Sequence, residues 1–265
     1  MTDLERRPLY DRGAGPGSSD LETVAVDCDS PIGQTCPMGF DSSSSEMSEN
    51  RPLSEVLRER TGKVHTEAER TGVIAGILRR EADRHAYALL LRNILPAYER
   101  LEAELSVHSA HPVLGVFADR TLSRSDRLRK DLARIEGVGW ERSLPALESG
   151  TAYADCVVRA AAGSGLRLVS HAYVRYFGDL SGGQILKKLL GKSLSLPAEA
   201  LTFYDFPGRE AQTLKTEMRD ALDRAGRLAE DPEMLVLEAI SAFEHNINVS
   251  REVQEKAGAK ASAPV

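Results

Sequence analysis

The sequence places a histidine and a glutamate four residues apart, which puts both side chains on one face of a helix. The stretch Thr61–Glu69 carries His65 and Glu69, and the other neighbours of His65 on that face are Thr61, Ala68 and Gly72. Because three of these four neighbours are small, a flat group can lie against the helix with the imidazole projecting toward it. Glu69 can hold the second ring nitrogen, as a carboxylate does for many metal-ligating histidines. Neutral imidazole is a common axial ligand of haem iron, so the pattern is compatible with that role. The alternative, which this stretch alone favours, is a partly exposed helix histidine beside glutamates.

The remaining five histidines are weaker candidates for a metal site. His108 and His111 lie close together beside Pro112, but no neighbouring carboxylate or cysteine completes a site. No histidine has a glutamate three residues before it, which excludes the paired Glu-x-x-His signature of di-iron bundles. No Cys-x-x-Cys-His motif is present, which excludes covalent c-type haem. The histidines that we interpret simply as helix positions are His85, His171 and His245.

A second unusual segment has helical flanks but contains three glycines. Gly178, Gly182 and Gly183 lie within Val174–Lys188, and each costs about 1 kcal/mol relative to alanine in a helix interior. Glycine at such positions allows the backbone to bend or to approach a ligand or another helix closely. Gly178 and Gly182 are four residues apart and share a face, so this helix is a candidate for close approach of its backbone to a ligand. Tight helix–helix packing is the alternative.

The elements that must position these residues are helices. Prolines separate the periodic segments from residue 51 onward, and nothing alternates apolar and polar residues as a strand does. We expect a first helix opening at Pro52 with Ser54 as its N-cap, and one or two helices over Ala152–Leu190, joined near Gly163–Gly165. Further helices are expected over Arg80–Leu105, Ser125–Ile135, Thr213–Ala229 and Pro232–Glu255. The sequence therefore predicts an all-α fold with a single domain.

The formal net charge of −6 is concentrated at the N-terminus. Residues 1–50 carry three arginines and ten acidic residues, and 17 of the 50 are Gly, Ser or Pro. Such a composition buries too little apolar area to offset the entropy of ordering. We therefore predict a disordered acidic extension over residues 1–50, a folded domain over 51–255 and a flexible tail over 256–265.

Composition also excludes several classes of protein. No run of about 18 apolar residues is present, so we expect no membrane partner. The acidic balance argues against a nucleic-acid partner. Three cysteines, Cys28, Cys36 and Cys156, are an odd and low count, which favours a reducing compartment. We expect a soluble, cytoplasmic protein.

Taken together, the histidine segment and the glycine segment resemble the haem oxygenase family. The matching stretches are Leu53–Glu69, His171–Lys188 and Ala242–Ile247, and the resemblance covers about residues 51–255. It implies an all-α domain that holds haem b between a proximal helix and a kinked distal helix. It also implies that haem is both substrate and cofactor, and that dioxygen and reducing equivalents open the ring to biliverdin, carbon monoxide and ferrous iron.

The resemblance assigns roles residue by residue. It makes His65 the axial ligand of the iron and Glu69 the hydrogen-bonding partner of that histidine. It makes Asp179, Arg175 and Tyr98 the catalytic residues of a distal hydrogen-bond network. The other haem-binding residues that it implies are Gly178, Gly182 and Gly183 over the haem, Arg58, Tyr173, Lys215 and Arg219 toward the propionates, and Phe243 and Asn246 in the pocket wall.

Two positions depart from the family pattern, and two further interpretations stay open. Gly62 stands where a basic residue often occurs, and Ser250 stands where an aromatic residue is expected. A non-catalytic haem-binding or haem-sensing protein of the same fold is the first alternative, with Cys36-Pro37 as a sensor motif. A helical packing partner without a cofactor is the second. For the enzyme, the expected electron donor is a ferredoxin or a flavin-dependent reductase.

Overall fold

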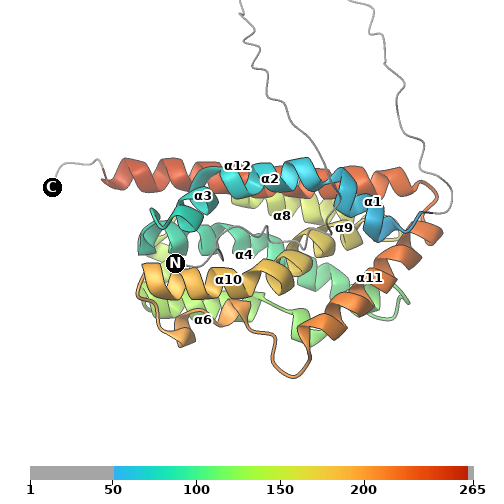
Figure 1. The fold of residues 1–265 in the computed structure, drawn as a ribbon, viewed down its shortest axis with the longest axis horizontal. Coiled ribbons are helices and arrows are strands. Elements are labelled where there is room, and N and C mark those ends of the chain that lie inside the picture. Colours follow the sequence, from blue (N-terminus) through green and yellow to red (C-terminus); the bar gives the residue numbers. More distant parts are fainter. Residues whose placement is uncertain (1–50, 262–265) are drawn as a thin grey trace, which may run out of the picture.

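The structure is a computed structural model that describes residues 51–261. Among these residues it contains helices and connecting segments and no strand, which confirms the all-α prediction (Figure 1). The expectations for residues 1–50, Cys28 and Cys36 lie outside the described residues. None of the helices described is long and apolar enough to cross a membrane. The longer helices are α1 (Leu53–Arg60), α2 (Gly62–Arg70), α3 (Gly72–Arg79), α4 (Arg84–Val107), α6 (Ser125–Glu136), α8 (Glu148–Ala160), α10 (Gly178–Ser193), α11 (Ala211–Leu228) and α12 (Pro232–Ala261).

Helix α4 runs through the centre of the fold and packs against α6, α8 and α12 (Figure 1). It begins later than the expected Arg80, because Arg80 adopts a left-handed conformation at the end of α3. The carboxylate of Asp83 accepts a 2.7 Å hydrogen bond from the Ala86 amide and caps α4 instead. Pro96 lies inside this helix and not at a break. The largely apolar sequence of α4 thus supplies the core against which the site is built.

The first predicted helix is divided into three. Ser54 is not its N-cap: Pro52 precedes α1, and the Ser54 amide donates to Asp223 Oδ1 of α11 at 2.9 Å. The chain bends at Thr61 and again at Thr71, so Gly72 is not on the helix face of His65. Gly72 has a φ of +58°, and a Cβ there would lie 2.3 Å from the Ser250 carbonyl oxygen. Close approach of α12 therefore explains this glycine.

Ser250 ties α12 to the bend between α2 and α3. Its hydroxyl donates to the Thr71 carbonyl at 2.9 Å and accepts from the Ile74 amide at 3.1 Å. The side chain is buried. An aromatic ring at this position would lose both hydrogen bonds, so the departure from the family pattern has a structural reason. Helix α12 also continues to Ala261, beyond its expected end at Glu255.

The glycine-rich segment is part of a helix that changes its winding twice, from α to π and back to α. Helix α9 (Leu168–Ala172) passes into a π-helical turn over Tyr173–Phe177 and then into α10. A π turn widens a helix by one residue per turn and is often found at functional sites. The break near Gly163–Gly165 separates this unit from α8, as predicted. The remaining short elements are α5 (Leu114–Phe117), α7 (Trp140–Ser143) and the 3₁₀ turns Arg120–Leu122, Ala198–Ala200 and Thr202–Tyr204.

Candidate functional site

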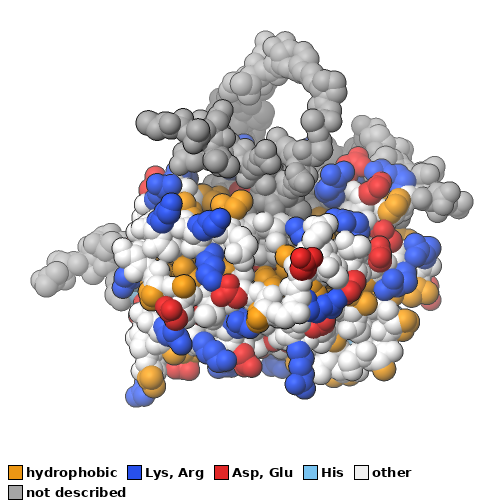
Figure 2. All heavy atoms as spheres, turned by 60° about the horizontal axis from the view of Figure 1, so that its bottom comes forward, with side chains coloured by type: hydrophobic (Ala, Val, Ile, Leu, Met, Phe, Trp, Pro, Cys, Tyr) orange, Lys and Arg blue, Asp and Glu red, His pale blue; other side chains and the backbone are white. Residues whose placement is uncertain are grey.

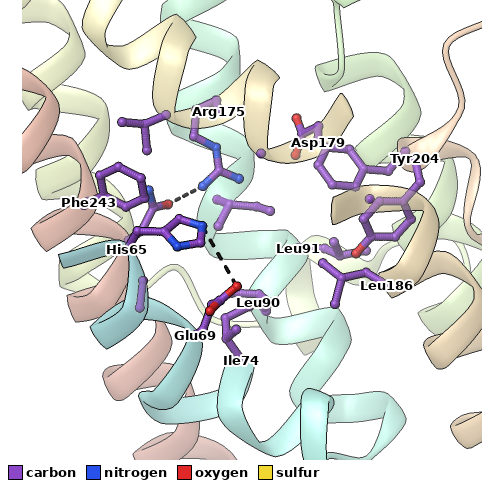
Figure 3. Close-up of a pocket in the computed structure, with 17 residues that line it drawn as sticks. His65, Glu69, Ile74, Leu90, Leu91, Arg175, Asp179, Leu186, Tyr204 and Phe243 are labelled. Atoms are coloured by element: carbon purple, nitrogen blue, oxygen red, sulfur yellow. Dashed lines mark hydrogen bonds and ion pairs between the residues drawn. The ribbon is translucent and has the colours of Figure 1, made fainter. Parts of the chain in front are cut away.

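A cavity lies between α2 on one side and the π turn with α10 on the other (Figure 3). Helix α4 lines its base, and the 3₁₀ turn Thr202–Tyr204 and α12 complete the walls. Its empty volume, with the open mouth included, is about 910 Å³. The residues that line it are His65, Ala68, Glu69, Ile74, Leu90, Leu91, Ile94, Val174, Arg175, Gly178, Asp179, Gly183, Leu186, Phe203, Tyr204, Phe243 and Asn246.

The predicted pair His65 and Glu69 lies at the α2 wall of this cavity (Figure 3). His65 Nε2 is 4.0 Å from Glu69 Oε1. The imidazole meets the Phe243 ring edge-on, with ring centroids 5.7 Å apart. Burial lowers the pKa of His65, and the negative charge of Glu69 opposes this only in part. The ring is therefore held neutral, which is the form of imidazole that ligates metals.

The opposite wall leaves room because of a glycine. A Cβ built on Gly178 would meet no atom within 4 Å. A Cβ on Gly183 would lie 3.0 Å from Cδ1 of Tyr204, so Gly183 allows the Tyr204 ring to pack against α10. Gly182 is buried but is not part of the cavity lining. Of the predicted distal glycines, Gly178 is thus the one that faces open space in the cavity.

A hydrogen-bond network connects the distal wall to α4 and α12. Tyr98 donates from its hydroxyl to Asp179 Oδ2 at 2.6 Å, and Arg175 donates to that hydroxyl at 2.8 Å. Arg175 also donates to Asn246 Oδ1, and its guanidinium lies over the Tyr98 ring, 4.5 Å from the centroid. The four residues come from α4, the π turn, α10 and α12. The structure therefore brings together the three residues predicted to be catalytic.

Burial shifts the pKa values of two groups in this network, Asp179 and Tyr98. Burial raises the pKa of Asp179, and the nearby Arg175 charge and the Tyr98 hydrogen bond lower it only in part. Burial raises the pKa of Tyr98 well above its usual value, so this hydroxyl keeps its proton. A carboxyl group with a raised pKa at the edge of an apolar cavity can hold or pass a proton or fix a water molecule.

Sequence reasoning missed the residues that close the cavity around this network. Phe203 and Tyr204 line it, and buried Asp131 of α6 holds their turn in place. The Asp131 carboxylate accepts hydrogen bonds from the Thr202 amide at 3.0 Å, the Thr202 hydroxyl at 2.6 Å and the Phe203 amide at 2.8 Å. No motif marks these positions, because the contacts join segments about 70 residues apart. The aliphatic lining from α4 was detectable as the apolar run around Leu89–Leu91.

Other predicted residues are not in the lining of the cavity. Tyr173 is buried, with its hydroxyl 3.4 Å from Thr61 Oγ1. Arg58 is exposed on α1, and Lys215 and Arg219 lie on α11, where Arg219 is exposed. Helices α1 and α11 pack against each other, so these basic residues belong to neighbouring elements at one end of the fold (Figure 1).

Comparison with known proteins gives a consistent result. The family model described as heme oxygenase matches residues 51–252. The chain is 32% identical to "Heme oxygenase 1" of Synechocystis sp. over 203 residues, covering 76% of this chain and 85% of that protein. It is 33% identical to human "Heme oxygenase 1" over 207 residues, covering 77% and 72%.

Solved structures agree with the sequence comparison. The crystal structure of heme oxygenase-1 from Synechocystis in complex with heme matches with a TM-score of 0.70 and 32% identity, covering 80% of this chain and 98% of that one. The structure of heme oxygenase from Leptospira interrogans matches with a TM-score of 0.70 and 30% identity, covering 76% and 100%.

Proposed function

The chain belongs to the haem oxygenase family, and on that premise we propose that the cavity between α2 and α10 is where it binds and opens haem. The protein is an enzyme that degrades haem, which serves it as substrate and cofactor. The observation that carries the assignment of the site is the pairing of a neutral imidazole, His65, with a glycine wall, Gly178, across one apolar cavity. A flat apolar ring system with a central metal fits that arrangement.

His65 is the residue proposed to ligate the haem iron, through a ring nitrogen kept neutral by burial. Glu69, 4.0 Å from His65 Nε2, keeps the ring oriented and raises its basicity. Phe243 packs edge-on against the imidazole and limits its rotation. When bound, haem supplies the iron that activates dioxygen and the porphyrin ring that is oxidised. The α2 wall thus fixes the position of the ring.

The distal residues are proposed to control protons. Asp179 receives a hydrogen bond from Tyr98, which in turn receives one from Arg175. These hydrogen bonds use one carboxylate oxygen of Asp179 and leave the other for a water molecule or a proton donor in the cavity. The aliphatic side chains of Leu90, Leu91 and Leu186 line the rest of the cavity and keep bulk water away from it. Asp179 is therefore the residue proposed to deliver protons in the reaction.

The basic residues at the α1 and α11 end are proposed to meet the propionates. Arg58, Lys215 and Arg219 come from two helices that pack together. The buried hydroxyl of Tyr173 lies 3.4 Å from Oγ1 of Thr61, the residue that follows α1. Arginine and lysine are the side chains that bind carboxylates. Charge reversal at Lys215 and Arg219 is expected to weaken haem binding or change which meso carbon is cut. Unchanged affinity with an unchanged biliverdin isomer would contradict this assignment.

Electron supply and location are further parts of the proposal. We propose a ferredoxin or a flavin-dependent reductase as donor, acting in the cytoplasm on a catalytic domain of residues 51–255. The low cysteine count supports a reducing compartment. Figure 2 shows Lys and Arg side chains interspersed with Asp and Glu on the face that it presents. Such a mixed surface suits a transient docking partner better than a nucleic acid, which favours a patch of one sign.

One experiment tests the proposed function against both alternatives. Haem is added to the protein, followed by a reductant in air, and the haem absorption band is recorded over time. The enzyme is expected to lose the band and form biliverdin. A stable haem complex without biliverdin would support a haem-binding protein, and failure to bind haem would support a packing module.

A further inference from the structure

Three metal-ligating side chains meet away from the haem cavity, where α8, α9 and α12 pack together. Cys156 comes from α8, His171 from α9 and Glu238 from α12. His171 Nε2 is 2.8 Å from Glu238 Oε1, and Cys156 Sγ is 3.8 Å from the same oxygen. One ligand atom from each residue lies within 4.8 Å of the other two. None of the three lines the haem cavity.

These separations are close to the edges of a coordination tetrahedron. Zinc binds sulfur at about 2.3 Å, imidazole nitrogen at about 2.0–2.1 Å and carboxylate oxygen at about 2.0–2.2 Å. In a tetrahedron those bonds place the ligand atoms about 3–4 Å apart. The 3.8 Å separation between Cys156 Sγ and Glu238 Oε1 lies in this range. The 2.8 Å hydrogen bond between His171 Nε2 and Glu238 Oε1 is shorter and must open for an ion to enter. Because each ligand stands on a different helix, the backbone already holds the site in shape.

We propose that Cys156, His171 and Glu238 bind a divalent transition-metal ion of the zinc class. The donor set of thiolate, imidazole and carboxylate suits zinc and its neighbours, whereas magnesium and calcium prefer oxygen alone. The Ser241 hydroxyl, 3.9 Å from Cys156 Sγ, or a water molecule completes four-fold coordination. Glu238 keeps 11% of its side chain exposed, which gives an ion a route from solvent.

The surrounding charges are compatible with such an ion. A thiolate and a carboxylate balance a divalent cation, and the thiol proton leaves to solvent when the metal binds. Arg167 Nη1 pairs with Glu238 Oε2 at 3.3 Å and so leaves Oε1 turned toward the cysteine and the histidine. Arg167 also donates to the Arg159 carbonyl at 2.6 Å, which holds its charge outward. The imidazole enters as the neutral ring, with its proton on the nitrogen that faces away from the ion.

The test uses the full chain with Cys28→Ser and Cys36→Ser, so that Cys156 is the remaining thiol. Co²⁺ is titrated into the haem-free protein, and the near-ultraviolet band of a cobalt–thiolate bond is recorded. We expect a band at one metal per chain that Zn²⁺ displaces. Cys156→Ser is expected to abolish the band, and Glu238→Gln to weaken Co²⁺ binding by about 100-fold or more.

Controls separate this site from the haem site and from unfolding. His245→Gln is the matched control, because His245 lies on α12 beside Tyr153 but outside the three-residue cluster; it should leave Co²⁺ binding unchanged. Zn²⁺ should raise the unfolding temperature of the parent protein but not that of Cys156→Ser. A band that persists in Cys156→Ser, or no band at any Co²⁺ concentration that the protein tolerates, would overturn the proposal. Neither result bears on haem turnover.

Discussion

Replacing Gly178 with alanine should stabilise the haem-free fold but weaken haem binding in the cavity. Gly178 has helical dihedral angles, φ −58° and ψ −50°, and a Cβ there would meet no atom within 4 Å. Alanine therefore fits without strain and removes the entropic cost of a glycine in a helix, about 1 kcal/mol. The same methyl group projects into the space that we assign to haem.

We expect Gly178→Ala to raise the free energy of unfolding of the haem-free protein by about 0.4–1 kcal/mol. For a domain of this size the unfolding temperature should rise by about 1–4 °C. Haem affinity and biliverdin formation should both fall, because the methyl group displaces the ring from the α10 wall. Differential scanning calorimetry of haem-free protein and a haem titration measure the two effects. Gly258→Ala is the control, since it also faces open space but lies far from the cavity on α12.

Two results would refute this reasoning. A haem-free Gly178→Ala protein that is less stable than the parent would show that the space beside Gly178 is not open. A variant that is more stable and turns over haem at the normal rate would show that the α10 wall does not contact the substrate.

Three further predictions concern the distal hydrogen-bond network, the turn held by Asp131, and the protonation of His65. Tyr98→Phe removes the hydroxyl between Arg175 and Asp179. The free energy of unfolding, measured with denaturant, should fall by about 1–3 kcal/mol, and biliverdin should form more slowly. Unchanged values in both assays would contradict a role of Tyr98 in the network. Asp131→Ala leaves the Thr202 and Phe203 amides without their acceptor. It should lower the free energy of unfolding by about 3 kcal/mol and weaken haem binding, whereas Asp126→Ala, at an exposed position of the same helix, should do neither. Equal effects of the two changes would contradict the positioning role of Asp131. Because burial lowers the pKa of His65 in the folded chain, the unfolded chain takes up the proton first as pH falls below about 6.5. The haem-free protein should therefore lose stability as pH falls from there, and His65→Gln should lose less; parallel pH profiles of the two proteins would contradict a neutral His65.

The sequence predicted the parts of the site that depend on local spacing. His65 and Glu69 share a helix face, and both line the cavity. The order of helices was also predictable, because proline and glycine breaks are visible in the chain. The boundaries that were wrong, at Ser54 and Arg80, were decided by a contact to Asp223 and by a left-handed helix end, which local patterns do not encode.

What depends on contacts between distant segments could not be predicted from spacing. The π turn over Tyr173–Phe177 arises where α9 passes into α10, and its sequence differs little from that of an ordinary helix. Asp131 supports a turn about 70 residues away. The cluster of Cys156, His171 and Glu238 joins three helices, and each residue taken alone is typical of a helix position.

The most direct test of the central claim is the biliverdin yield per bound haem of the wild type and of Asp179→Asn. Asparagine can still accept the Tyr98 hydrogen bond but cannot deliver a proton as a carboxyl group does. Both proteins should bind haem with the same axial-ligand spectrum from His65. After reductant is added in air, the wild type should convert its haem to biliverdin and the variant should not. Equal yields at equal haem occupancy would contradict the account.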